Sequence, residues 1–332
     1  MKAAVIRETG SPSCIKIEDL PVPLPGRGEV LVRVRAVAVN PIDTYIRSGA
    51  VKAQLPVPYV IGCDLAGDVE AVGSDVQRFR VGDRVWGSNQ GLAGRQGSFS
   101  EQAAVGEQWL YPVPDGVSYE QAAAGALTGI TAHLGLFLHG GLQAGDVVFV
   151  NGGTGGVGSA VVQIAAASEA TVITTVGSSA KAEEARRLGA DYVINYRDGD
   201  PFSAVAQLAE KAGKVNLWFE TLRTPSPEQT FPLLARRGRY ILMAGRDARP
   251  VFPVGPFYVN DLRAVGFAMF NASADEQRRA ADSLNAMMAA GRLKPFIGRT
   301  FPLEQAAAAH ELQEANTLNG AGTLSGKIVL TM

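Results

Sequence analysis

Five glycines stand among eight consecutive residues, 151–158, of the stretch VVFVNGGTGGVGSAVVQIAAA (Val147–Ala167). A glycine inside a regular element costs about 0.5–1 kcal/mol relative to alanine, so this density needs a physical reason. The apolar run before the glycines is typical of a buried strand, and the apolar residues after them recur at helical spacing (Val157, Val161, Ile164). A strand, a glycine turn and a helix that follow one another so closely predict that something approaches this backbone.

The glycines include a complete Gly-x-Gly-x-x-Gly motif at Gly153, Gly155 and Gly158. After a strand and before a helix, this motif is the fingerprint of a dinucleotide site. We expect the first glycine to make the tight turn, the second to let the backbone approach a pyrophosphate, and the third to let helix and strand pack closely. The N–H groups of Gly156, Val157 and Gly158 would then meet the phosphate charge together with the helix dipole.

The residues after the loop favour one kind of nucleotide. Sites for NAD place an acid about 20 residues after the glycines, where it binds the ribose hydroxyl. No acid occurs here between Glu169 and Glu183, and TVGSSAK (Thr175–Lys181) stands in its place. Lys181 alone would also fit an ordinary solvated helix lysine. Together with the missing acid, its charge and two serine hydroxyls predict NADP(H), because a carboxylate would repel a 2′-phosphate.

The prolines divide the chain into three sections. Nine lie between Pro12 and Pro114, nine between Pro201 and Pro302, and none in between. The first section has alternating runs such as EVLVRVRAVAV (Glu29–Val39) and regular glycines, which is typical of a small β-barrel. The second alternates strand-like and helix-like segments, which predicts a doubly wound parallel sheet. The expected helices are Tyr119–Leu138, Lys181–Leu188, Asp275–Ala290 and Glu304–Glu314, and the expected strands include Val147–Val150, Thr171–Val176, Tyr192–Ile194, Val215–Phe219, Tyr240–Met243, Leu262–Phe270 and Lys327–Thr331.

Composition excludes several classes of function. The net charge of −1 gives no support to nucleic acid or an anionic membrane as a partner. Polar residues or glycines interrupt every apolar run, so we expect no membrane span, and MKAAVIRETG turns polar too early for a signal peptide. The two cysteines, Cys14 and Cys63, are typical of a reduced, cytoplasmic protein. The three histidines form no i,i+3 or i,i+4 pair and no CxxC exists, which argues against a structural zinc site and leaves a catalytic zinc only scattered ligands.

Four further stretches carry a family resemblance: NPIDTYIRSG (Asn40–Gly49), GCDLAGDVEAVGSDVQRFRVGDRV (Gly62–Val85), LTGITAHLGL (Leu127–Leu136) and LGADYVINYRD (Leu188–Asp198). With the glycine loop, they make nearly the whole chain resemble the zinc-free quinone oxidoreductase branch of the medium-chain dehydrogenase/reductases, the zeta-crystallin type. This resemblance implies an α/β fold. A GroES-like β-barrel domain at residues 1–124 and 271–332 would flank a Rossmann domain, with its doubly wound parallel sheet, at residues 125–270.

The departures from the zinc enzymes of this superfamily agree with the small number of metal donors. Where zinc alcohol dehydrogenases carry Cys-x-x-Asp, this chain has Asn40-Pro41-Ile42-Asp43, and where they carry Gly-His-Glu it has Gly62-Cys63-Asp64. The resemblance therefore implies no metal, and Cys63 is expected to be a small buried residue. Val51 stands where some members have a second pocket tyrosine, which leaves the substrate open.

The resemblance also implies the site residues. Asn40 and Tyr45 match residues that line the substrate and nicotinamide pocket, and Asp43 lies beside them, although Tyr45 would equally fit a barrel-surface aromatic. Thr131 matches the threonine that contacts the nicotinamide, and Thr128 flanks it, although both would also fit helix packing. The remaining cofactor positions implied are Gly177, Ser178, Lys181 and Tyr196 at the 2′-phosphate and Thr221, Ala244 and Gly245 at the ends of later strands.

The function so implied is NADPH-dependent hydride transfer to a quinone or another α,β-unsaturated carbonyl, with a small-molecule substrate and no nucleic acid or membrane partner. An enoyl or alkenal double-bond reductase is an alternative that only a substrate panel separates. A zinc alcohol dehydrogenase would contain stoichiometric metal, and a non-enzymatic NADPH-binding protein, structural or RNA-binding, is a third reading. The strand at Leu262–Phe270 is expected at the edge of the sheet, where it would pair with its mate in a homodimer.

Overall fold

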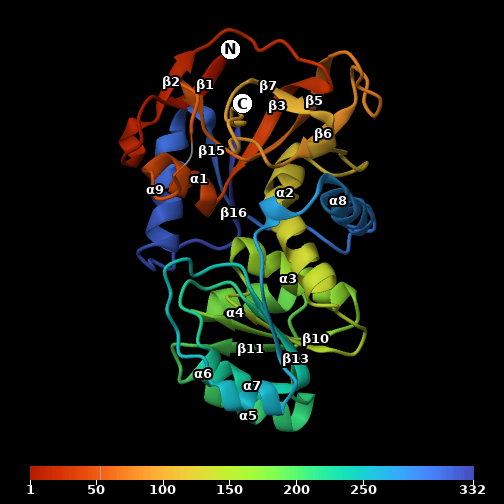
Figure 1. Cartoon of the computed structure of the whole chain (residues 1–332), viewed down its shortest axis with the longest axis vertical. Helices are drawn as coiled ribbons and strands as arrows, with labels where there is room; N and C mark the ends of the chain where they lie inside the picture. The colour runs from red at the N-terminus through yellow and green to blue at the C-terminus, as the bar shows by residue number, and fades with distance from the viewer. Residues whose placement is uncertain (53) are drawn as a thin grey trace. The chain divides into compact units, whose positions relative to one another are not determined.

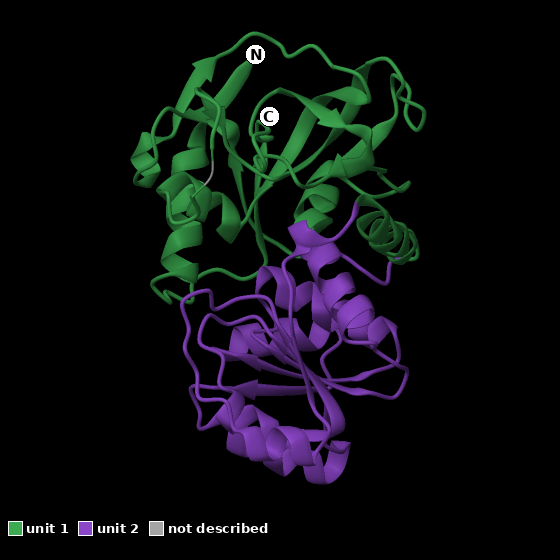
Figure 2. Cartoon of the chain, viewed as in Figure 1, with its two compact units in different colours: residues 1–127, 274–290, 295–332 green, residues 128–273, 291–294 purple. Residues whose placement is uncertain are grey.

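The computed structural model describes residues 1–52 and 54–332, and the chain divides into two compact units (Figures 1 and 2). The first unit comprises Met1–Leu127, Ala274–Ala290 and Pro295–Met332, and the second comprises Thr128–Ser273 and Gly291–Lys294. The main limits, 127 and 273, lie three residues after the expected domain limits of 124 and 270.

The first unit is built on two sheets. A three-stranded sheet has the order β2-β1-β4, and a larger one has the order β15-β16-β3-β5-β6-β8, with β7 paired to β3. The strands are β1 (Lys2–Ile6), β2 (Lys16–Asp19), β3 (Glu29–Val39), β4 (Tyr59–Val60), β5 (Asp64–Val72), β6 (Arg84–Gly87), β7 (Gln102–Gly106), β8 (Leu110–Pro112), β15 (Ile297–Pro302) and β16 (Lys327–Thr331). The helices are α1 (Pro41–Ser48), α8 (Ala274–Ala289) and α9 (Ala306–Thr317), with 3₁₀ turns at Pro12–Cys14, Glu107–Trp109 and Leu303–Gln305.

The alternation predicted for β3 decides which of its faces is buried. Val32 and Val34 are buried, whereas Arg33 and Arg35 between and after them are exposed and pair with carboxylates of β5. The buried face packs on apolar residues from β5 and β16, including Leu65, in one core. The small barrel expected from the alternation and the glycines is therefore confirmed, with the C-terminal strand β16 paired to β3.

The second unit is a six-stranded, entirely parallel sheet of order β11-β10-β9-β12-β13-β14. The chain adds strands on one side of β9 and then returns to its other side, so the doubly wound fold is confirmed. The strands are β9 (Val147–Asn151), β10 (Thr171–Val176), β11 (Tyr192–Asn195), β12 (Val215–Glu220), β13 (Leu234–Leu242) and β14 (Arg263–Gly266). The helices are α3 (Gly156–Ala167), α4 (Ser179–Arg187), α5 (Pro201–Ala212), α6 (Pro227–Thr230) and α7 (Val254–Val259), with 3₁₀ turns at Phe231–Leu233 and Met269–Asn271.

The last strand of this sheet is shorter than the sequence predicts. Leu262–Phe270 was expected to be strand throughout, whereas β14 ends at Gly266. The reason is its partner: β13 ends at Leu242, which pairs with Gly266, so the following residues have no neighbouring strand. Its predicted position at the edge of the sheet is confirmed.

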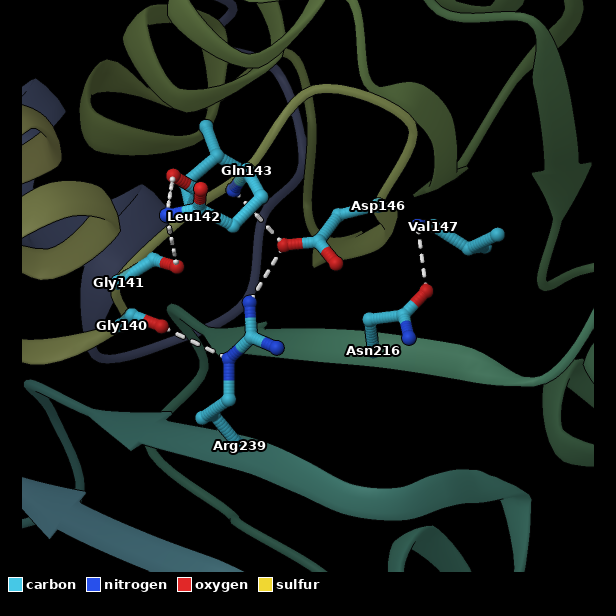
Figure 3. A network of polar contacts seen from close by, with 8 residues as sticks. All are labelled: Gly140, Gly141, Leu142, Gln143, Asp146, Val147, Asn216 and Arg239. Atoms are coloured by element: carbon cyan, nitrogen blue, oxygen red, sulfur yellow. Dashed lines mark hydrogen bonds and ion pairs between the residues drawn. The ribbon is translucent and has the colours of Figure 1, made fainter.

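The amino ends of the sheet are tied to the loop that leads into β9 (Figure 3). Arg239 of β13 donates through Nε to the carbonyl of Gly140 at 2.7 Å and through Nη2 to Asp146 at 2.5 Å. The same carboxylate oxygen accepts the N–H of Gln143 at 2.9 Å. These contacts connect β13 to the loop before β9 at the amino ends of their strands. In doubly wound sheets, ligands bind at the opposite edge, where the carboxyl ends of the strands lie.

One helical stretch overturns an expectation about apolar runs. The residues of α2 (Tyr119–His133) and the π-helical turn that follows (Leu134–His139) form a helix that is long and apolar enough, by length and composition, to cross a membrane. The helix continues through the glycines within it, although we expected glycines to interrupt each apolar run. Of its most apolar part, 67% is buried inside the structure, which is typical of a core helix.

Candidate functional site

The glycine loop after β9 has the expected form with one change of role. The left-handed residue of the turn is Gly152, with a φ of +82°, and not Gly153. Gly153 is needed for another reason, because a Cβ there would lie 2.1 Å from Oγ1 of Thr174. A Cβ on Gly158 would lie 2.1 Å from the carbonyl oxygen of Gly152, so the third glycine does allow close packing of helix and turn.

Helix α3 begins directly on this loop. Gly155 is its N-cap, in extended conformation, and Gly156, Val157 and Gly158 form the first turn. N–H groups in a first turn have no carbonyl one turn earlier to bind, and they carry the positive end of the helix dipole. This end of α3 is therefore suited to a phosphate group.

A polar network beneath the loop was not predicted from the sequence. Thr175 Oγ1 accepts the N–H of Gly152 at 2.9 Å and donates to Oδ1 of Asn151 at 2.7 Å. Asn151 in turn donates to the buried carboxyl group of Glu220 at 3.2 Å, and burial raises the pKa of that group. One sequence feature could have predicted this network: each of its polar residues lies at or next to the carboxyl end of a buried strand, in VVFVN, TVITTV and VNLWFE.

The residues matched to the 2′-phosphate pocket lie together at the ends of β10 and β11. Ser178 is the N-cap of α4, where its hydroxyl oxygen accepts the N–H of Lys181 at 3.3 Å. The ring of Tyr196 lies against Gly177, where a Cβ would come within 2.2 Å of the phenol oxygen. The sequence analysis did not include a second cation, Arg197, which directly follows Tyr196. Burial, and then the charge of Arg197, lower the pKa of Lys181.

The other expected positions of this unit are spread over later strand ends and helix α2. Thr221, directly after β12, donates its hydroxyl to the carbonyl of Asn151. Gly245, after β13, has a φ of +85° and lies close to the backbone of Arg223, next to the half-buried Ala244.

On α2, Thr128 and Thr131 are buried. Among residues 1–52 and 54–332, the structure contains no hydrogen-bond partner for Oγ1 of Thr131. Two residues later, the ring of His133 packs against Phe137, and burial lowers the pKa of His133 to about 4.

The expected substrate residues of the first unit lie on and before α1. Asn40 is the N-cap of this helix, Pro41 is its first residue, and the carboxylate of Asp43 accepts the N–H of Asn40 at 2.7 Å. Tyr45 is half-buried on the same helix, so it is not a surface residue of a barrel strand. The carbonyl of Tyr45 accepts the N–H of Val51 at 3.1 Å, which holds Val51 next to the end of α1.

Asn40 and Asp43 belong to a buried polar cluster with Cys63, Asp64 and Lys327. Burial raises the pKa of Asp43 to about 7, against a hydrogen bond from the Cys63 thiol, which lowers it. Burial also raises the pKa of Cys63 well above its usual value, and Cys63 is fully buried, as expected. The described residues contain no group of three or more His, Cys, Asp or Glu side chains that could hold a metal ion.

Comparisons with known proteins agree with this architecture. The chain matches the family model for the alcohol dehydrogenase GroES-like domain over residues 26–115 and that named zinc-binding dehydrogenase over residues 156–286. It is 32% identical to the quinone oxidoreductase of Homo sapiens over 333 residues, which cover 100% of this chain and 98% of that protein. The structure of Escherichia coli quinone oxidoreductase complexed with NADPH matches at a TM-score of 0.86 and 27% identity, over 100% of both chains. A structure described as an NAD-dependent alcohol dehydrogenase matches at a TM-score of 0.87 and 31% identity, again over 100% of both chains.

Proposed function

The chain belongs to the zinc-free quinone oxidoreductase branch of the medium-chain dehydrogenase/reductase superfamily, and we propose that it transfers hydride from NADPH to a quinone or another α,β-unsaturated carbonyl. The observation that most directly supports this reaction is the carboxyl edge of the parallel sheet. There, the glycine loop after β9 adjoins a basic, hydroxyl-rich group, Ser178, Lys181 and Tyr196, after β10 and β11. The full-length similarity to proteins named quinone oxidoreductase supports the class of acceptor.

The residues of the second unit fit a nicotinamide dinucleotide phosphate. The glycines leave no side chains over the start of α3, and the buried hydroxyl of Thr131 has an unused hydrogen-bonding capacity among the described residues. The N–H groups of Gly156 and Val157 would bind the pyrophosphate, and Lys181 would bind the 2′-phosphate with Gly177, Ser178 and Tyr196. Thr128 and Thr131 would hold the nicotinamide, and Thr221, Ala244 and Gly245 would border the dinucleotide. When bound, NADPH supplies the hydride for the reduction.

The first unit would bind the acceptor through α1. Hydride addition to a quinone leaves negative charge on an oxygen, which a nearby hydrogen-bond donor stabilises. Tyr45 is our proposed donor, because the residue is half-buried on α1 and its phenol can donate a hydrogen bond to an oxygen. Asn40 and Asp43 would support this helix from its first turn. A proton from solvent completes the hydroquinone.

We also propose a homodimer, a cytoplasmic location, and activity without a metal ion. The dimer is supported by the short edge strand β14, which is paired on one side only, and by the exposed apolar side chains of α7 just before it. The location is supported by two cysteines that are both free thiols.

A single assay tests the reaction. The purified protein is mixed with NADPH or NADH and with one acceptor at a time: a benzoquinone, a naphthoquinone, an enal, an enone or an enoyl thioester. We expect NADPH oxidation with at least one quinone, slower oxidation with NADH, and full activity after dialysis against a chelator.

Reduction of an enal or enoyl thioester alone would instead make the protein a double-bond reductase. NADPH binding with no oxidation by any acceptor would favour the non-enzymatic alternative, and stoichiometric zinc with alcohol oxidation would contradict the proposal.

A further inference from the structure

Lys327, the first residue of β16, has its ammonium group in the interior of the first unit. The residue is only 4% exposed, and its Nζ donates to the carbonyl of Val39 at 2.5 Å and to Oδ1 of Asn40 at 2.6 Å. Lysines are almost never fully buried unless they are paired, because an isolated charge is costly outside water. An ammonium in this place therefore has to be balanced by groups around it.

The negative charge of the Asp64 carboxylate balances this ammonium, and the side chain of Asn40 connects the two groups. The Nδ2 group of Asn40 donates to the carboxylate of Asp64 at 2.8 Å and to the carbonyl of Ala38 at 3.3 Å, while its Oδ1 accepts from Lys327. Turning the amide over would place its NH₂ group against the ammonium and its oxygen against the carboxylate. The two charges thus fix one orientation of the Asn40 amide.

Each charge also opposes the effect of burial on the pKa of the other group. Burial raises the pKa of Asp64 and the charge of Lys327 lowers it, whereas burial lowers the pKa of Lys327 and the charge of Asp64 raises it. The carboxylate of Asp64 also accepts the N–H of Leu127 in α2 at 3.3 Å, so the pair is anchored to the helix backbone as well.

We propose that Lys327 is a positioning residue of the substrate site: its ammonium, through Asn40, holds the first turn of α1 and so the helix that carries Tyr45. Asn40 is the N-cap of α1, and its own N–H is bound by Asp43 in that turn. A shift of the Asn40 side chain therefore reaches the helix directly. This inference rests on the proposed function, since it gives Lys327 a part in the reduction of the acceptor.

The test is a comparison of variants by quinone reduction, with kcat expressed per NADPH-binding site. Counting sites by NADPH titration removes unfolded protein from the comparison. Lys327→Met should lower kcat at least about tenfold and leave the Kd for NADPH unchanged, because misplacement by about 1 Å costs on the order of 100-fold. Lys16→Met, at an exposed lysine of the same unit, is the matched control and should be unchanged.

A double-mutant cycle shows whether Lys327 acts through Asn40. If it does, Lys327→Met in an Asn40→Ala background should lower kcat less than about twofold further, because the connection is already broken. Equal losses in both backgrounds would overturn the inference.

Lys327→Met leaves Asp64 buried without its counter-charge, which destabilises the fold. A second variant therefore separates a loss of folding from a loss of positioning. Lys327→Met with Asp64→Asn carries neither charge and should fold. It should still lose kcat, since Asn40 Oδ1 has lost its donor. Wild-type kcat in this double variant would overturn the inference, whereas a wild-type protein that reduces no quinone would overturn the proposed function instead.

Discussion

A Cβ atom on Gly177 would lie 2.2 Å from the phenol oxygen of Tyr196. The two residues follow neighbouring parallel strands, and the N–H of Tyr196 is bound by the carbonyl of Val176 at 3.0 Å, which fixes the backbone that carries the ring. Tyr196 is still 49% exposed, so its phenol is available to a ligand. The place of this phenol therefore depends on the absence of a side chain at residue 177.

Gly177→Ala is expected to displace Tyr196 and weaken NADPH binding by about tenfold, the loss of one hydrogen bond to a charged group. NADH binding should change little, because that nucleotide has no 2′-phosphate. Fluorescence titration with both nucleotides measures the effect. Tyr196→Phe, which keeps the ring and removes the hydroxyl, should lose a similar amount of NADPH affinity. If Gly177→Ala weakened both nucleotides equally, Tyr196 would not be part of a 2′-phosphate site.

A buried histidine predicts sensitivity to acid. His310 is fully buried, its ring nitrogens have no partner among the described residues, and burial together with the charge of Arg47 lowers its pKa to about 3. The unfolded chain takes up this proton near pH 6.5, so the unfolding free energy should fall as the pH is lowered below about 6.5, by up to about 1.4 kcal/mol per pH unit.

The measurement is urea unfolding of the wild type and His310→Met at several pH values between about 7 and 5. The stability lost by the wild type on acidification should exceed that lost by the variant. His133 contributes with the same sign and Asp43, whose pKa is raised to about 7, with the opposite sign, but both are present in the two proteins and cancel in the difference. Parallel pH curves would contradict the assignment.

Tyr45→Phe tests the proposed hydrogen-bond donor to the acceptor. We expect kcat for quinone reduction to fall by about tenfold or more. A fully buried oxyanion donor contributes on the order of 10²–10³, and Tyr45 is only half-buried. NADPH affinity should not change. Tyr258→Phe, at an exposed tyrosine of the second unit, is the control. Unchanged kinetics with every accepted substrate would leave Tyr45 without a part in the reaction.

The proposed dimer predicts an effect of charge beside the edge strand. Val259 lies at the end of α7, just before β14, and is 64% exposed. If the edge strands pair, Val259→Glu in both copies should lower the dimer fraction at micromolar concentration, because two carboxylates would be desolvated at the interface. Val81→Glu, at an equally exposed valine of the first unit (64%), is the matched control. Light scattering measures both, and a monomeric wild type would contradict the proposal.

The strand ends at this site could be predicted because each expected residue directly follows a buried run. Buried strands that alternate with helices form a parallel sheet, and their carboxyl ends lie at one edge. The sequence pattern is therefore enough to place Gly153, Gly177 and Tyr196 at the same edge. The sequence did not predict which glycine of the loop would adopt the left-handed conformation. Either Gly152 or Gly153 can adopt a positive φ, and the structure gives it to Gly152, whereas Gly153 is required by its close approach to Thr174.

Side chains that act across long sequence distances could not be predicted in this way. Lys327 begins an otherwise apolar strand, which suggests an exposed strand end, and its partner Asn40 lies 287 residues away. Glu220 likewise contacts Asn151 only after the sheet is assembled. The length of β14 could not be predicted for the same reason. The strand ends where its partner β13 ends, whereas the apolar residues continue beyond that point.

Choice of nucleotide should depend most on Lys181. Its ammonium would face a group with close to two negative charges, and hydrogen bonds between charged groups contribute about 1.5–3 kcal/mol each, so Lys181→Ala should weaken NADPH binding by about 10- to 150-fold. Partial exposure moves the expected loss toward the lower value, and added salt should shrink it further. Arg197→Ala should give a smaller loss of the same kind, because its charge reaches the same region, as its effect on the pKa of Lys181 indicates.

NADH separates this effect from a general loss of binding. Its free ribose hydroxyl needs no cation, so its affinity should barely change in Lys181→Ala, and Lys211→Ala on the exposed side of α5 should change neither nucleotide. Fluorescence titration of each variant with both nucleotides gives the comparison. An equal loss of NADPH and NADH would place Lys181 at the pyrophosphate, which the two share. Equal affinity of the wild type for both would mean that this group of residues does not select NADPH at all.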